Sequence, residues 1–208
     1  MEALFQWRHR GIHLIDCREL LALAERTGML GRITRYTLTQ IAAQLTGLPV
    51  GLNIGAHQLL DPGFTDIVLD TLDDCGFPAD RLIVEIVESE HLDDPAARDQ
   101  LDRLAARGVR VALDDFGTGY VSLAALRSFP IHQLKVDGAF LTGDQGALDL
   151  VLSMGRLLDT ETVVLGVHEP AQLDRVRGLG ADGAQGDAVA GLLTGEDMRA
   201  AWSRTAPA

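Results

Sequence analysis

This 208-residue sequence has few cysteines, fewer basic than acidic residues and no long apolar run. Two cysteines, Cys17 and Cys75, are too few for a disulfide framework or a thiolate zinc site. The six histidines fall at no metal-ligand spacing such as HExxH. No run approaches the ~20 apolar residues of a membrane helix, and no N-terminal segment has the pattern of a signal peptide. We therefore expect a cytoplasmic protein without a membrane segment.

The charge balance narrows the classes of partner. Eighteen Lys and Arg against 30 Asp and Glu give a net charge of −12. Such an acidic surface argues against duplex DNA and anionic membranes, both of which attract basic faces. A small anionic ligand would need metal ions to bridge it to the carboxylates. Since 47% of the residues are hydrophobic, the chain can build one full-sized core, and we expect a single domain over residues 1–208.

Short apolar runs alternate with segments of helical period along the chain. The runs that we predict as strands are 50–54, 82–87, 109–113, 133–136 and 162–167, with a weak sixth near Ala184. The segments that we predict as helices are 18–27, 33–46, 63–75, 96–107, 122–128, 147–158, 171–178 and 195–203. This alternation indicates parallel strands with right-handed crossovers, in either an open doubly wound sheet or a (β/α)8 barrel.

Polar residues at the predicted strand ends distinguish the two folds. These residues are Asn53, Glu85, Glu88, Asp114, Asp115, Lys135, Asp137 and Gln185. In a barrel they converge on one mouth, whereas an open sheet spreads them along an edge. No GxGxxG phosphate loop follows the first strand, so the dinucleotide fold lacks its main signature. We predict an α/β fold of the (β/α)8, or TIM-barrel, type.

Two adjacent carboxylates end one apolar run, in the stretch VALDDFGTGY at residues 111–120. Asp114 and Asp115 repel each other, so either water or a cation must compensate them. Glu85 lies within LIVEIV, where a buried carboxylate is costly unless it is paired or binds a metal. Lys135 stands likewise within LKV, and an ion pair with Glu85 would explain both residues structurally.

Together, Asn53, Glu85, Asp114 and Asp115 form a set of hard oxygen ligands, which suits Mg²⁺, Mn²⁺ or Ca²⁺. Two such ions can clamp a phosphodiester, generate a hydroxide and stabilise the leaving oxygen. Lys135 beside them would hold the attacking water or a phosphate oxygen. The residues therefore indicate metal-dependent hydrolysis of a phosphodiester, or metal-dependent binding of one.

The sequence resembles the EAL domain, the bacterial phosphodiesterase domain that linearises cyclic di-GMP. The matching pieces come in family order over nearly the whole chain: Glu2-Ala3-Leu4, Asn53, Glu85-Ile86-Val87-Glu88, the stretch DDFGTG from Asp114 to Gly119, Leu134-Lys135-Val136-Asp137 and Gln185-Gly186. The DDFGTG stretch is the most specific single piece of this resemblance. It implies a barrel that, in this chain, lacks its first one or two strands.

The resemblance also implies the roles of individual residues. Those matching the family's Mg²⁺ or Mn²⁺ ligands are Glu2, Asn53, Glu85, Asp114 and Asp115. Lys135 matches the active-site lysine of the family, Glu88 its loop-supporting glutamate and Gln185 its site glutamine. The residues expected to contact the ligand are Leu4, Asp137 and Gln185. The DDFGTG loop is associated in the family with metal binding and dimer contact, so a homodimer or another protein partner could use it.

Several departures from the family pattern bear on activity. Leu165 stands where the family has the first glutamate of a Glu-Gly-Val-Glu segment, and His168 replaces the second. Gln6 replaces an arginine that grips a ligand phosphate, and Asp187 replaces an aromatic residue. Since leucine can neither bind a metal nor accept a proton, hydrolysis should fall by about 10²–10⁴-fold. We expect a degenerate EAL domain that binds cyclic di-GMP or a protein partner; the alternative is an active phosphodiesterase that yields linear pGpG.

Overall fold

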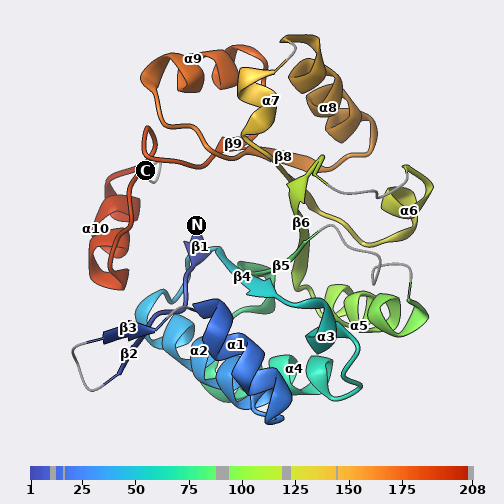
Figure 1. Ribbon diagram of the computed structural model, residues 1–208, viewed down its shortest axis with the longest axis vertical. Helices are drawn as coiled ribbons and strands as arrows, with labels where there is room; N and C mark the ends of the chain where they lie inside the picture. The colour runs from blue at the N-terminus through green and yellow to red at the C-terminus, as the bar shows by residue number, and fades with distance from the viewer. Residues whose placement is uncertain (10–12, 16, 88–93, 119–122, 144, 206–208) are drawn as a thin grey trace. The chain divides into compact units, whose positions relative to one another are not determined.

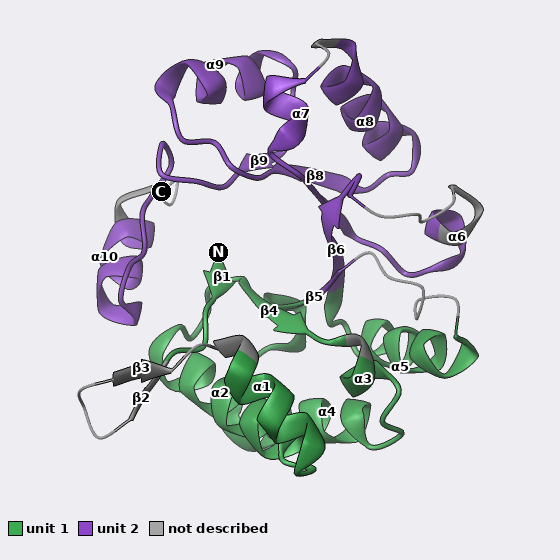
Figure 2. Ribbon diagram, viewed as in Figure 1, with its two compact units in different colours: residues 1–84, 94–110 green, residues 85–93, 111–208 purple. Residues whose placement is uncertain are grey.

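The computed structural model describes residues 1–9, 13–15, 17–87, 94–118, 123–143 and 145–205 (Figure 1). The chain forms two compact units (Figure 2). Unit 1 comprises Met1–Val84 and Asp94–Arg110, and unit 2 comprises Glu85–Asp93 and Val111–Ala208. A single domain over residues 1–208 stays a prediction.

In its described residues, unit 1 contains a parallel strand pair, a hairpin and five α-helices. Strand β1 (Glu2–Ala3) pairs in parallel with β4 (Val50–Ile54), and β2 (Trp7–His9) pairs antiparallel with β3 (His13–Ile15). The helices are α1 (Cys17–Arg26), α2 (Leu30–Gln44), α3 (Ala56–Leu59), α4 (Phe64–Cys75) and α5 (Pro95–Ala106), and a short 3-10 helix, η1, spans Ala79–Arg81. Strand β5 (Leu82–Val87) begins in unit 1 and continues into unit 2.

Unit 2 repeats strand and helix in alternation. Strands β6 (Arg110–Phe116), β7 (Gln133–Val136), β8 (Glu161–Val164) and β9 (Gly183–Ala184) pair in parallel, each with the next. The helices are α6 (Leu123–Ser128), α7 (Ala139–Thr142), α8 (Gln145–Leu157), α9 (Pro170–Gly178) and α10 (Gly195–Thr205) (Figure 1). Parallel strands joined by helices confirm the predicted α/β class.

Local chemistry sets the ends of several helices. Helix α5 begins at Pro95, because the Asp94 side chain accepts a hydrogen bond from Ala96 N (2.8 Å) and proline has no N–H to satisfy. Helix α4 ends where Gly76 adopts a left-handed φ of 63°. Helix α9 begins with a reciprocal capping box between Glu169 and Gln172. At these three ends the predicted and observed helix limits agree within one residue.

Two predicted strand ends were wrong. Strand β6 does not end at Leu113 but continues through both aspartates to Phe116, because a bulge lets the chain resume its pairing with β7. Strand β8 ends at Val164 rather than at Val167, because Gly166 takes a φ of +67° that turns the chain out of the strand. The sequence prediction also missed the hairpin β2–β3 and the four-residue helices α3 and α7, which are too short to show a period.

The core of unit 2 lies between its strands and helices. Its buried side chains come from β7, α7, α8, β8, the loop after β8, and α9: Val136, Leu141, Leu148, Val151, Leu152, Val164, Val167 and Val176. This packing fixes the carboxyl ends of β7 and β8, which carry the candidate site residues. Among the described helices, none combines the length and the apolar character needed to cross a bilayer.

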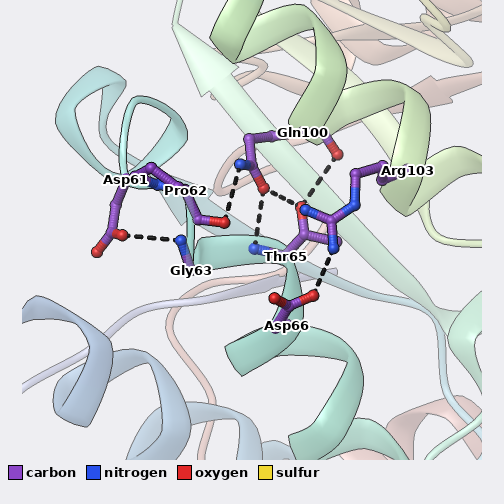
Figure 3. A network of polar contacts seen from close by, with 7 residues as sticks. All are labelled: Asp61, Pro62, Gly63, Thr65, Asp66, Gln100 and Arg103. Carbon is purple, nitrogen blue, oxygen red and sulfur yellow. Dashed lines mark hydrogen bonds and ion pairs between the residues drawn. The ribbon is translucent and has the colours of Figure 1, made fainter.

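A buried polar network joins α4 to α5 in unit 1 (Figure 3). The side-chain carbonyl of Gln100 accepts from both the amide (3.1 Å) and the hydroxyl of Thr65, and its amide group donates to Pro62 O (3.2 Å). Thr65 is fully buried and Gln100 is 5% exposed. Nearby, Arg103 and Asp66 form an ion pair whose side chains are 40% and 62% exposed. Because it is buried, the Gln100 network should contribute more to the stability of the protein than the exposed ion pair of Arg103 and Asp66.

Replacing Gln100 with leucine should destabilise the protein by about 2–3 kcal/mol, because the Thr65 N–H and the Pro62 carbonyl lose their buried partner. The matched control Arg103→Ala removes only an exposed ion pair and should cost less than about 1 kcal/mol. Urea denaturation gives both free energies of unfolding. A loss in Arg103→Ala as large as that in Gln100→Leu would contradict the assignment.

Candidate functional site

The adjacent carboxylates of Asp114 and Asp115 lie on a distorted part of β6. Leu113 is in register with Leu134 and Phe116 with Val136, so three steps along β6 match two along β7. Asp115 takes up the difference with a left-handed φ of 52°, which is uncommon for residues other than glycine. The bulge therefore breaks the regular alternation of side chains at the carboxylate pair.

A buried lysine compensates Asp114. The Lys135 Nζ atom on β7 donates to Glu85 Oε2 at 2.6 Å and lies 2.9 Å from Asp114 Oδ1. The Lys135, Glu85 and Asp114 side chains are 2%, 4% and 13% exposed. The predicted ion pair between Glu85 and Lys135 is thus confirmed. The cation that compensates the Asp114 carboxylate here is therefore the ammonium group of Lys135.

The three side chains leave the cluster negatively charged. One ammonium faces two carboxylates, and Asp115 follows directly in the chain. Asp114 Oδ1 is buried, and within the described part of the chain it has no partner in hydrogen-bond geometry, although the ammonium lies at ion-pair distance. A buried oxygen with unused lone pairs in a negatively charged cluster has the chemistry that a hard cation prefers.

The predicted metal ligands are divided between the two units. In unit 1, Asn53 Nδ2 donates to Glu2 Oε1 at 2.5 Å, so these two residues of β4 and β1 lie together. Unit 2 holds Glu85, Asp114 and Asp115. Over the residues that the structure describes, no group of three or more His, Cys, Asp or Glu side chains could hold a metal ion. The donor types fit Mg²⁺ or Mn²⁺, and the five-residue ligand set stays a prediction.

Leu165 lies in the loop after β8, whose backbone is hydrogen-bonded to its neighbours. Leu165 N donates to Val136 O (2.9 Å), and Val167 N donates to Gln185 O (3.0 Å). On one side, a Cβ at Gly138 would lie 3.0 Å from Leu165 O, and on the other a Cβ at Gly186 would lie 2.3 Å from Val167 O. Backbone contacts with both neighbouring segments therefore set the place of residue 165.

The structure pairs two of the departures with each other. His168 Nδ1 lies 2.8 Å from Asp187 Oδ2, and both side chains are largely exposed. The His168 imidazole thus lies beside the carboxylate that Asp187 brings, and such an exposed pair contributes little stability.

Other predicted site residues have different surroundings. Asp137 Oδ1 accepts from Ala139 N (2.7 Å), so this side chain holds the first turn of α7. Leu4 is 57% exposed, and Gln6 and Gln185 are exposed. Glu88 and Gly119 lie outside the described residues. The roles predicted for these residues in catalysis and ligand binding stay predictions.

The sequence prediction missed Phe140 on α7. Its ring edge occupies the space beside Gly117, in the loop that follows the two aspartates. An aromatic residue beside a glycine-rich loop carries no sequence signal that separates it from an ordinary core residue.

Removing the Lys135 charge should strongly destabilise the protein. Lys135→Met leaves Glu85 and Asp114 buried without their cation, which should cost about 3–5 kcal/mol in the free energy of unfolding. The double variant Lys135→Met/Glu85→Gln removes one stranded charge and should recover part of that loss. Urea denaturation measures all three proteins. A double variant less stable than Lys135→Met would show that the charge on Glu85 is not compensated by Lys135.

Comparison with known proteins places this geometry in a family. The model of the family described as "EAL domain" matches residues 1–191. The protein y4lL of Sinorhizobium fredii is 35% identical over 203 residues, which are 92% of this chain and 24% of y4lL. The bifunctional diguanylate cyclase/cyclic di-GMP phosphodiesterase MucR of Pseudomonas aeruginosa is 30% identical over 215 residues, 96% of this chain and 31% of MucR. The chain thus spans less than a third of these relatives.

Solved structures agree. A MucR phosphodiesterase structure in complex with c-di-GMP has a TM-score of 0.85 and 31% identity, and the match covers 95% of this chain and 86% of that one. The EAL domain of FimX from Pseudomonas aeruginosa, bound to c-di-GMP, has a TM-score of 0.82 at 20% identity. The match covers 91% of this chain and 82% of that one, and it supports the fold alone. These likenesses confirm the predicted barrel-type α/β fold. By family model, relatives and fold together, the chain belongs to the EAL domain family of cyclic di-GMP signalling proteins.

Proposed function

We propose that this chain is a degenerate EAL domain that binds cyclic di-GMP as a sensor or regulatory module and hydrolyses it weakly or not at all. The single observation that carries the proposal is Leu165, where the family pattern has a glutamate. The loop backbone is in place through its bonds to β7 and to Gln185, so the missing part is the carboxylate itself.

The remaining residues still suit a phosphodiester ligand. When bound, Mg²⁺ or Mn²⁺ would polarise the phosphodiester and supply a hydroxide. In unit 2, Glu85, Asp114 and Asp115 are the residues that would hold such an ion. Lys135 is held in place by Glu85 and would donate to a phosphate oxygen or to a water beside it.

Two substitutions lower the expected rate and affinity. A leucine at residue 165 can neither take a proton nor orient water, which should cost about 10²–10⁴-fold in turnover. Gln6 offers a neutral amide instead of a bidentate guanidinium, so a ligand phosphate is held less tightly.

Restoring the acid tests the proposal directly. Leu165→Glu should raise turnover of cyclic di-GMP with Mn²⁺ by about 10²-fold or more, because it returns the missing carboxylate to the same backbone position. The control Leu150→Glu adds the same charge at a site on α8 that is 71% exposed, and should leave turnover unchanged. Chromatography of the linear product follows both. Turnover of about 1 s⁻¹ or faster in the unaltered protein would overturn the proposal.

Binding is measured separately by calorimetry with cyclic di-GMP and Ca²⁺. Binding by the unaltered protein supports the sensor role. Its absence excludes that role and favours a domain that contacts only a protein partner, directly or as a homodimer.

The alternative is an active metal-dependent phosphodiesterase, and the Lys135 cluster favours it. Lys135 retains both carboxylate neighbours, with the Glu85 side chain 4% and the Asp114 side chain 13% exposed. In an active enzyme, Asp114→Asn should abolish formation of linear product. Unchanged turnover in that variant would refute the alternative.

A further inference from the structure

An aromatic side chain lies against the loop that carries the two aspartates. Gly117 has a φ of +101°, and a Cβ on it would lie 2.3 Å from Cε2 and 2.5 Å from Cζ of Phe140. Such distances are far inside van der Waals contact, so only glycine leaves room for the ring. The edge of the Phe140 ring therefore closes the space next to the backbone at Gly117.

The loop at Gly117 benefits from such support, because it follows a residue with an uncommon backbone conformation. Asp115 has a left-handed φ of 52°, which costs free energy for a residue with a side chain, although aspartate adopts it more readily than most. The turn is closed locally, because both the amide and the hydroxyl of Thr118 donate to Asp115 O, at 3.2 and 2.8 Å. Across to β7, Asp137 N donates to Phe116 O at 3.3 Å. The conformation of the aspartate pair thus depends on where this turn lies.

Phe140 can provide the support because α7 is anchored at both ends. Asp137 Oδ1 accepts from Ala139 N (2.7 Å) at the start of the helix. At its end, Arg175 Nη1 on α9 donates to Leu141 O (2.8 Å), and Leu141 itself is buried in the core. Phe140 packs partly buried against the same core. The ring is therefore held by α7 and α9 rather than by the loop that it contacts.

We propose that Phe140 is a positioning residue for Asp114 and Asp115. Its ring keeps the turn at Gly117 from shifting toward α7, and so maintains the left-handed Asp115 and the direction of both carboxylates. Phe140 touches no ligand in this role and acts only through the loop. Its benefit to cation binding rests on the proposed function of these carboxylates.

Hydrogen exchange in the metal-free protein tests the positioning itself. The amides of Thr118 and Asp137 report on the turn and on its link to β7, and NMR resolves them singly. Phe140→Ala should speed their exchange by about tenfold, because the turn opens more often without the ring. The control Leu173→Ala truncates a side chain on α9 that packs against the same core and should leave both amides unchanged. Equal exchange in the unaltered protein and Phe140→Ala overturns the proposal.

Calorimetric titration with Mn²⁺ then measures the consequence. Phe140→Ala should weaken Mn²⁺ binding by about tenfold, with a smaller loss in Phe140→Leu and none in Leu173→Ala, because a less restrained loop pays an ordering cost on binding. Equal weakening in Phe140→Ala and Leu173→Ala would assign the loss to general destabilisation and overturn the proposal. If the unaltered protein binds no Mn²⁺, cation binding under the proposed function fails, while the exchange rates still decide the role of Phe140.

Discussion

The buried ammonium group of Lys135 is the charge on which the acidic side chains around it depend. A carboxylate as deeply buried as Glu85 loses most of its hydration, and only a close counter-charge makes that environment tolerable. Lys135 is itself 2% exposed and has the same need. Residues of β5, β6 and β7 in unit 2 therefore share one electrostatic centre, and the strands cannot shift past one another without stranding a charge.

This centre explains why the acidic residues could persist whatever the activity of the domain. The ion pairs give Glu85, Lys135 and Asp114 a structural role in unit 2 that does not require a bound metal or a reacting phosphodiester. At Leu165, by contrast, backbone bonds to β7 and to Gln185 set the loop, and these bonds do not involve the side chain. Electrostatics thus constrains the charged residues of the cluster, whereas backbone hydrogen bonds constrain the loop.

The sequence predicted the parts of this arrangement that depend on local pattern. Apolar runs located β4, β5 and β7, and segments of helical period located α4, α5 and α9. The polar residues Glu85 and Lys135 within apolar runs predicted their own ion pair. By contrast, the bulge at Asp114–Asp115 depends on the register between β6 and β7, which no local pattern encodes. The pairing of His168 with Asp187 joins residues 19 positions apart, so it also needed the folded chain.

The loop at Leu165 has a consequence for how such a domain can change over time. Its course is determined by main-chain hydrogen bonds and by the close approach of Gly138 and Gly186, and none of these contacts uses the side chain at residue 165. A different side chain at residue 165 would meet the same main-chain contacts, so the course of the loop does not specify which residue stands there. The backbone and the chemical groups that it carries can therefore vary independently at this position.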